Sequence, residues 1–274
     1  MHKVILVILD GLNARTAFEN MGFLQHMVEM GVSSRYTVEA QLPTLSRPLY
    51  EVLLTGVPVY EHGTVNNEIR RMSKERSIFH LSAENGLVTA AAAYGWISEL
   101  YNKSPFLPEE DRFQLNVPRP IQHGIFYYED MYPDSHLFND AEFLRMSFNP
   151  DFLLIHSMNI DYAGHVYGGL SPEYVYSVVK ADGILSRYIK QWLSLGWSVI
   201  VTADHGMNSI KLHNGVSDDE RLTPLYIAGA QGVWPEEQRV SQLELAPFIC
   251  RLLGVAPSKK MKGGGLQPSE GRGL

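Results

Sequence analysis

Short apolar segments spaced along the chain constrain its fold more than any other feature of the sequence. They read KVILVIL (3–9), LVTAAAAY (87–94), DFLLIHS (151–157), WSVIVTA (197–203) and PLYIAG (224–229). Apolar runs of this kind indicate parallel strands that are buried on both faces. Helical patterns lie between some of them, and the clearest has Ser171 as N-cap, Pro172 at the first helical position and Gly196 just past its end. This alternation predicts an α/β fold, with helices on both faces of a mostly parallel sheet.

Length and local composition predict the domain organisation. A chain of 274 residues is long enough to bury a core of its own, and we expect one domain over residues 1–257. Residues 95–135 are rich in Pro, Tyr and Asp and show no clear periodicity, so we expect a small irregular cap or lid there. The Gly-rich, polar segment 258–274 is expected to be disordered.

Net charge and cysteine content limit the kinds of partner and the cellular compartment that we expect. The net charge is −7, which disfavours a nucleic acid polymer or an anionic membrane as partner because binding to phosphates is usually driven by basic residues. The single cysteine, Cys250, cannot form an internal disulfide, which fits a reducing compartment. The apolar run 4–9 is too short for a signal peptide, and no stretch has transmembrane length. We therefore expect a cytoplasmic protein that acts on a small molecule.

Aspartates follow three of the apolar segments. Asp10 comes directly after the first, Asp161 shortly after the third and Asp204 directly after the fourth. An isolated aspartate after a strand is usually a turn residue. In open α/β sheets, however, functional sites gather outside the carboxyl ends of the strands, so three such carboxylates are expected to converge.

Histidines accompany these aspartates and suggest a metal site. His165 lies four residues after Asp161, His205 is adjacent to Asp204, and His213 follows shortly after. Converging carboxylates repel one another and lose hydration unless a cation neutralises them. Mixed oxygen and imidazole ligands suit Zn²⁺, Mn or Fe better than Ca²⁺.

The stretch QLPTLSRPLYEVLLTG (41–56) contains a serine with two possible roles. Ser46 precedes an apolar helical pattern and has a proline close behind it, as an N-cap residue often does. Beside a metal centre, the same hydroxyl would be a candidate nucleophile, because metal coordination and the positive end of a helix both favour its alkoxide. The sequence leaves both roles open.

Four segments together resemble the type I phosphodiesterase/nucleotide pyrophosphatase family of the alkaline phosphatase superfamily. They are VILDGL (7–12), PTLSRPLYEVLLTGVPVYEHGTVNN (43–67), DYAGHVYG (161–168) and TADHGM with LHNG (202–215), in the family's order. The resemblance implies a three-layer αβα fold and a dinuclear centre holding two divalent ions, with zinc favoured over Mn or Fe. It implies hydrolysis of phosphodiester or pyrophosphate bonds through a phosphoseryl intermediate.

The resemblance also implies roles for individual residues. One ion would be held by Asp161, His165 and His213, and the other by Asp10, Asp204 and His205. Ser46 would be the nucleophile and an additional metal ligand, with Thr44 as a competing hydroxyl. Asn67 would donate a hydrogen bond to a phosphoryl oxygen, with Asn66 as the alternative.

Two positions depart from the nucleotide-cleaving members that the sequence resembles. Arg47 stands where they often have phenylalanine, and His156 replaces an aromatic residue five positions before Asp161. We expect both side chains to contact substrate, and Arg47 could bind a second anionic group of it. The alternative for Arg47 is an ion pair with Glu51, four residues further on. A phosphonoacetate-type C–P hydrolase and a phosphomonoesterase therefore remain alternatives with the same chemistry. A non-catalytic binding protein on the same fold is the alternative from another class. A sulfatase is disfavoured, because Tyr50 stands where sulfatases carry arginine.

Overall fold

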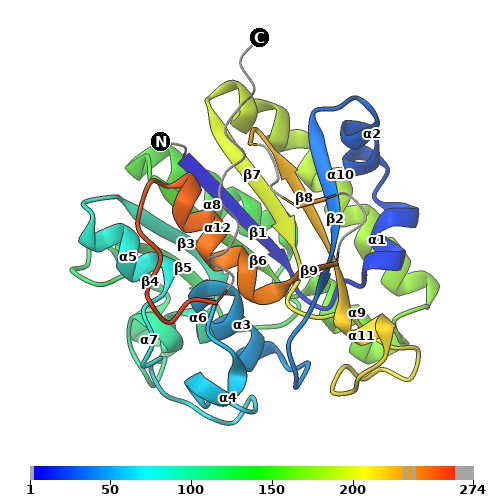
Figure 1. Ribbon diagram of the computed structural model, residues 1–274, viewed down its shortest axis with the longest axis horizontal. Helices are drawn as coiled ribbons and strands as arrows, with labels where there is room; N and C mark the ends of the chain where they lie inside the picture. The colour runs from blue at the N-terminus through cyan, green and yellow to red at the C-terminus, as the bar shows by residue number, and fades with distance from the viewer. Residues whose placement is uncertain (1–2, 231–233, 236–238, 263–274) are drawn as a thin grey trace.

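The computed structural model describes residues 3–230, 234–235 and 239–262 and contains one central sheet (Figure 1). Within this part of the chain the sheet has nine strands, in the order β4-β5-β3-β6-β1-β7-β8-β2-β9. Their bounds are β1 Lys3–Leu9, β2 Ser33–Glu39, β3 Thr89–Tyr94, β4 Phe113–Leu115, β5 His123–Tyr127, β6 Phe152–Ser157, β7 Trp197–Thr202, β8 Leu222–Ala228 and β9 Arg239–Ser241.

Most neighbouring strands are parallel. The five strands β5, β3, β6, β1 and β7 form a continuous parallel block, and β9 runs parallel to β2. Strand β8 is antiparallel to both of its neighbours, and β4 is antiparallel to β5. The carboxyl ends of the five parallel strands therefore meet at one edge of the sheet.

The five predicted strands are confirmed, with boundaries within two residues of those expected. One of them, over residues 224–229, was expected to be parallel, and that expectation is wrong. The chain from β7 to β8 stays at the carboxyl edge of the sheet instead of crossing back over one face, so β8 must run in the opposite direction.

Helices cover both faces of the sheet, as predicted. Their bounds are α1 Ala14–Asn20, α2 Gly22–Glu29, α3 Ser46–Thr55, α4 Val59–His62, α5 Ile78–Glu84, α6 Gly95–Tyr101, α7 Pro108–Asp111, α8 Asp134–Phe148, α9 Asn159–Tyr167, α10 Pro172–Ser194, α11 Asp218–Arg221, the 3₁₀ helix Gln242–Glu244 and α12 Leu245–Leu252. Helix α10 has the predicted cap, in which the Ser171 side chain accepts from the backbone N–H of Tyr174.

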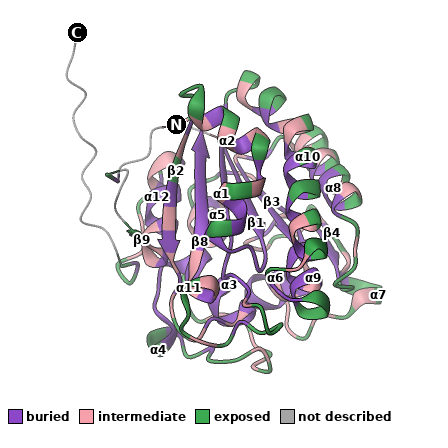
Figure 2. Ribbon diagram, turned by 90° about the vertical axis from the view of Figure 1, so that its right-hand side faces the viewer, coloured by how far each residue is buried: buried purple, intermediate pink, exposed green. Residues whose placement is uncertain are grey.

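The side-chain alternation of the strands produces two cores. In β1, Ile5, Val7 and Leu9 face a core shared with α1, α2, α8 and α10. Val4, Leu6 and Ile8 face the opposite core, shared with α3, α5, α6 and α12. Figure 2 shows buried strands between helices whose outer faces are exposed. The three-layer αβα prediction is confirmed.

The segment 95–135, expected to form an irregular cap, is more ordered than its sequence suggests. It contains α6, α7, β4 and β5, and β5 pairs with β3, so much of the segment extends the sheet. Strands of three and five residues are too short for periodicity to reveal. Of the expected disordered tail, residues 258–262 pack on the domain, where Met261 is buried; the rest, 263–274, lies outside the described residues.

Among the helices of the described ranges, none combines the length and the apolar character that crossing a membrane requires.

Candidate dinuclear metal centre and nucleophile

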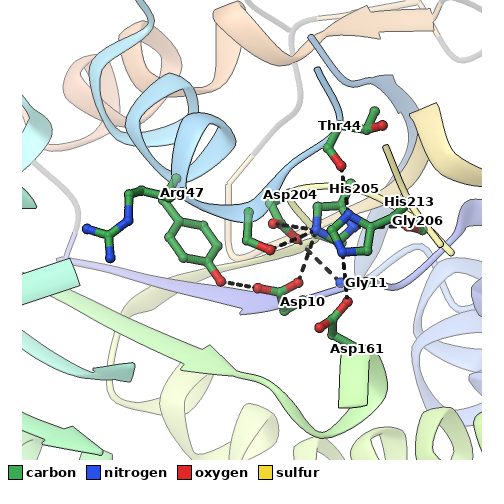
Figure 3. Close-up of polar contacts among 12 residues, drawn as sticks. Asp10, Gly11, Thr44, Arg47, Asp161, Asp204, His205, Gly206 and His213 are labelled. Carbon is green, nitrogen blue, oxygen red and sulfur yellow. Dashed lines mark hydrogen bonds and ion pairs between the residues drawn. The ribbon is translucent and has the colours of Figure 1, made fainter. Parts of the chain in front are cut away.

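The carboxyl ends of β1, β6 and β7 bring the three predicted aspartates together (Figure 3). Asp10 follows β1, Asp161 lies in the first turn of α9 after β6, and Asp204 follows β7. All three are buried. Gly11 makes this approach possible, because a β-carbon at its position would lie 2.8 Å from the Cα of Asp161.

Two ligand groups form around these carboxylates. In the first, His205 Nε2 lies 3.4 Å from Asp10 Oδ1 and 3.2 Å from Asp204 Oδ2. In the second, His165 Nε2 lies 3.4 Å from Asp161 Oδ2 and 3.0 Å from His213 Nε2. Donor atoms around a tetrahedral Zn²⁺ ion are about 3.3 Å apart, given bonds of about 2.0 Å. Five of the six predicted ligands form two compact groups, Asp10 with Asp204 and His205, and Asp161 with His213 and the same His205. His165 adjoins the second group and is the most exposed of the six, with 43% of its side chain accessible.

The imidazoles are oriented for metal binding by backbone carbonyls. Nδ1 of His165 lies 3.1 Å from the carbonyl oxygen of Lys211, Nδ1 of His205 lies 2.9 Å from that of Gly206, and Nδ1 of His213 lies 2.7 Å from that of Thr44. A carbonyl can only accept, so Nδ1 carries the hydrogen in each ring. Nε2 is then left with a lone pair directed toward the carboxylates.

The carboxylates offer oxygens that have no other partner. Oδ1 of Asp10, Oδ1 of Asp161 and Oδ2 of Asp204 are buried and accept no hydrogen bond from any residue that the structure describes. Buried carboxylate oxygens without a hydrogen-bond donor are costly without a cation and favourable with one. The residues present therefore fit a pair of divalent ions.

The electrostatics of the cluster support the same conclusion. Burial, together with the charge of Asp10, raises the pKa of both Asp161 and Asp204 well above the usual range. Burial also acts to raise the pKa of Asp10, but the hydrogen bond to His156 and the proximity of His205 outweigh it and lower this pKa to about 2. Burial lowers the pKa of His205 to about 3, so its ring is neutral and able to ligate at pH 7.

Ser46 faces the candidate metal centre and does not cap α3. The N-cap residue is Leu45, which makes no side-chain cap, and Ser46 is the first residue of the helix. Its Oγ lies 3.1 Å from His205 Nε2, among the atoms of the first ligand group. The competing hydroxyl of Thr44 instead donates to the carbonyl oxygen of Gly215.

Asn67 lies beside Ser46. Its Oδ1 accepts the backbone N–H of Arg47 at 3.0 Å, which leaves its NH₂ group without a hydrogen-bond partner among the described residues. The alternative, Asn66, is exposed and accepts the backbone N–H of Glu68. The placement of Asn67 is the one compatible with donation to a phosphoryl oxygen next to Ser46.

Arg47 lies on the side of Asp10 away from the imidazoles (Figure 3). Its fully buried guanidinium forms an ion pair with Glu99 at 2.7 Å, donates to the carbonyl oxygen of Asn67 and lies over the ring of Trp96. Glu99 thus replaces Glu51 as its partner. A guanidinium that is buried and paired is not accessible to a second anionic group, contrary to the expected substrate contact.

His156 is also enclosed by protein. Its side chain is fully buried, and its Nε2 lies 3.2 Å from Asp10 Oδ2. The structure therefore places this ring behind the carboxylate of Asp10, a predicted metal ligand, where it does not face a substrate.

Two residues that the sequence analysis did not identify support the site. The Tyr50 hydroxyl donates to Asp10 Oδ2. Tyr50 lies four residues after Ser46 and so on the same face of a helix, a spacing that was visible in the sequence. Glu220 accepts hydrogen bonds from the backbone of Gly215 and the side chain of Asn208, and so orders the loop that carries His213. It also forms a capping box with Ser217, and the Ser-x-x-Glu spacing of that box is a pattern visible in the sequence.

Comparison with known proteins supports the predicted family. The family model for type I phosphodiesterase / nucleotide pyrophosphatase matches residues 4–227. Among curated proteins, GPI ethanolamine phosphate transferase 2 of Schizosaccharomyces pombe is 23% identical over 312 residues, which cover 97% of this chain and 38% of that protein. The catalytic subunit of human GPI ethanolamine phosphate transferase 2 is 23% identical over 288 residues, covering 98% and 28%. The chain thus spans well under half the length of these relatives.

Solved structures share the fold. Human ectonucleotide pyrophosphatase / phosphodiesterase 5 superposes with a TM-score of 0.72 at 14% identity, over 93% of this chain and 96% of that one. Phosphonate monoester hydrolase from Silicibacter pomeroyi gives a TM-score of 0.64 at 16% identity, over 99% and 78%. Family and fold together support an enzyme that acts on phosphoesters. The chain belongs to the type I phosphodiesterase / nucleotide pyrophosphatase family.

Proposed function

We propose that this protein cleaves a phosphodiester or pyrophosphate bond in a small substrate, with Ser46 as the nucleophile. The observation that carries the proposal is the position of Ser46 Oγ, 3.1 Å from His205 Nε2, inside a cluster of three buried carboxylates and three imidazoles. A hydroxyl placed there can reach phosphorus while the substrate's charge is neutralised.

Two divalent ions fit the proposed site, one held by Asp10, Asp204 and His205 and the other by Asp161, His165 and His213. When bound, such ions neutralise phosphoryl charge and favour deprotonated oxygen at neutral pH. The mixed oxygen and nitrogen donors favour zinc, with Mn or Fe as alternatives.

The protein's own groups then carry out the displacement. Ser46 Oγ gives its proton to solvent water and attacks phosphorus, so the Oγ–P bond forms as the bond to the leaving oxygen breaks. The leaving oxygen keeps the bonding electron pair and takes up a proton from solvent where its basicity requires one. The start of α3, where Ser46 is the first residue, favours the negative charge. Asn67 is placed to donate its free NH₂ group to an equatorial oxygen, which stabilises the transition state.

The second step releases the phosphoryl group from Ser46. An acceptor oxygen attacks phosphorus, the Oγ–P bond breaks, and the acceptor's proton is lost as Ser46 regains its own. With water as acceptor the reaction is hydrolysis, and with an alcohol it is transfer. The names of the relatives, GPI ethanolamine phosphate transferases, support transfer of ethanolamine phosphate as the second candidate.

The test compares the wild type with Ser46→Ala after both are loaded with zinc. The substrates are bis-p-nitrophenyl phosphate, p-nitrophenyl phosphate and phosphonoacetate, which separate diesterase, monoesterase and C–P hydrolase activity. We expect the diester to be cleaved fastest, and Ser46→Ala to reduce its kcat/KM by roughly 10³-fold or more. Equal turnover by the two proteins would refute the role of Ser46, and loss in Thr44→Val instead would assign it to Thr44.

Hydrolysis and transfer are separated by their products. The p-nitrophenyl ester of ethanolamine phosphate is offered with and without a high concentration of glycerol as acceptor. A transferase would form glycerophosphoethanolamine at the expense of free ethanolamine phosphate, with p-nitrophenol counting the turnovers. Free ethanolamine phosphate as the sole product at every glycerol concentration would favour hydrolysis.

A further inference from the structure

The two oxygens of the Asp10 carboxylate have different surroundings. Oδ2 accepts a hydrogen bond from the Tyr50 hydroxyl and lies 3.2 Å from His156 Nε2. Oδ1 accepts none from the residues described, and lies 3.4 Å from His205 Nε2. One oxygen is therefore held by protein donors, while the other is presented to the centre.

The donors on Oδ2 are themselves fixed in place. Tyr50 and His156 are both completely buried, and their rings meet edge to face with centroids 4.6 Å apart. The backbone of His156 is part of β6, and its carbonyl oxygen accepts the Tyr127 hydroxyl at 2.8 Å. Because an ionised carboxylate can only accept, His156 Nε2 must carry the hydrogen in this contact.

We propose that Tyr50 and His156 are positioning residues, which hold Asp10 in the one orientation that directs Oδ1 to a metal ion. The inference rests on the proposed function only in taking Asp10, Asp204 and His205 as one ligand set. Neither residue contacts substrate, since both are enclosed. They act by removing the freedom of the carboxylate to rotate and to offer both oxygens.

The position of Tyr50 gives this arrangement a further consequence. Ser46 and Tyr50 lie one turn apart on α3, so the same helix places the nucleophile and the hydroxyl that orients Asp10. The hydroxyl thereby ties the ligand on β1 to the start of α3. Loss of the hydroxyl should loosen this one ion site and leave the site of Asp161, His165 and His213 intact.

Zinc titration of metal-stripped protein by calorimetry tests the proposal without reference to activity. The variants are Tyr50→Phe, which removes one oxygen, His156→Leu, which removes the donor, and His156→Gln, whose amide can donate in its place. Tyr101→Phe is the matched control, because Tyr101 is equally buried and its hydroxyl has no hydrogen-bond partner within the described structure. Circular dichroism of the metal-free proteins checks that each is folded.

The wild type should bind two zinc ions. In Tyr50→Phe and His156→Leu, the Kd of one ion should rise by about 10- to 100-fold, as is usual when a partner of a metal ligand is lost, while the other Kd is unchanged. His156→Gln should recover most of the affinity, and Tyr101→Phe should match the wild type.

Several outcomes would overturn the proposal. They are two unchanged affinities in Tyr50→Phe, an equal weakening of both ions, or a wild type that binds fewer than two. If His156→Leu does not fold, the single-oxygen change in Tyr50→Phe decides the question. A wild type that binds two ions, and responds to these variants as expected, but cleaves no phosphoester would refute the proposed function and leave this inference standing.

Discussion

Replacing Gly11 with alanine should damage the proposed metal centre through a single methyl group. Gly11 has a φ of +73°, and its β-carbon would lie 2.8 Å from Asp161 Cα and 2.9 Å from Asp161 Oδ1. Ordinary contact begins at 3.4 Å, so the methyl group needs roughly 0.6 Å of additional space. The nearest obstacle is backbone, which cannot rotate away, so Asp161 must move relative to Asp10.

The cost can be divided into two parts. The left-handed backbone conformation costs alanine roughly 1–2 kcal/mol wherever it occurs. Displacement of Asp161 adds a second effect, confined to the site. A misplacement of 1 Å can cost on the order of 10²-fold in kcat/KM, so a shift of roughly 0.6 Å should cost on the order of 10-fold. Zinc affinity should fall as well, because Asp161 is a proposed ligand.

Gly31→Ala separates these effects. Gly31 has a φ of +69°, but its β-carbon would meet no atom within 4 Å. Both variants should lose about 2–4 °C of Tm for each kcal/mol, and only Gly11→Ala should lose zinc affinity and diester turnover. Thermal melts, zinc titration and steady-state kinetics supply the comparison. If the two alanine variants bind zinc and turn over alike, the steric argument is refuted.

Three other perturbations have defined outcomes. Glu99→Gln should lower the free energy of unfolding in urea by roughly 3–5 kcal/mol, because it leaves the buried Arg47 without a counter-charge. Adding Arg47→Met to this variant should restore part of the lost stability. If it restores none, the ion pair is not the cause of the loss. Burial raises the pKa of Asp134 from 3.8 to about 6, so this group's stabilising contribution is present below pH 3.8 and is lost as the pH rises to about 6. The full loss of stability is on the order of 3 kcal/mol, and Asp134→Asn should abolish it. If urea unfolding shows that the wild type and Asp134→Asn lose the same stability between pH 4.5 and pH 7.5, the prediction is contradicted. Removal of bound metal with a chelator should lower the Tm at pH 7.5, because the buried carboxylates then repel one another. Added zinc should restore the Tm. A Tm that chelation leaves unchanged would contradict the proposed metal centre.

The site could be predicted largely because its ligands follow strands. Buried parallel strands leave a strong apolar signal, and the residue after each strand must lie at the shared carboxyl edge. Asp10 and Asp204 were therefore placed by topology as well as by family resemblance. The contact of Tyr50 with Asp10 was not predicted, because a tyrosine in an amphipathic helix normally packs in a core. Its hydroxyl acquires a role only through a contact with a residue that is distant in sequence.

The wrong expectation for the partner of Arg47 also arises from contacts between residues that are distant in sequence. Arg47 and Glu51 stand four residues apart and could pair on an isolated helix. Each instead has a partner that is distant in sequence, Glu99 for the first and Ser73 for the second, whose hydroxyl donates to Glu51 at 2.5 Å. A spacing of four residues predicts which side chains pair on an isolated helix in water. The prediction fails where residues from elsewhere in the fold are within reach of both side chains.

The burial of helix α3 limits which residues its sequence can carry. All ten of its residues are buried, so each polar side chain on it must find a partner or incur a desolvation penalty. Ser46 and Tyr50 face the ligand centre on one side, while Arg47 and Glu51 enter separate ion-pair and hydrogen-bond networks on another. A substitution at any of these four positions would leave a partner elsewhere unsatisfied. Ser46, the proposed nucleophile, is thus held by a helix that polar contacts fix on two sides, and attack on phosphorus from one fixed direction would require such rigidity.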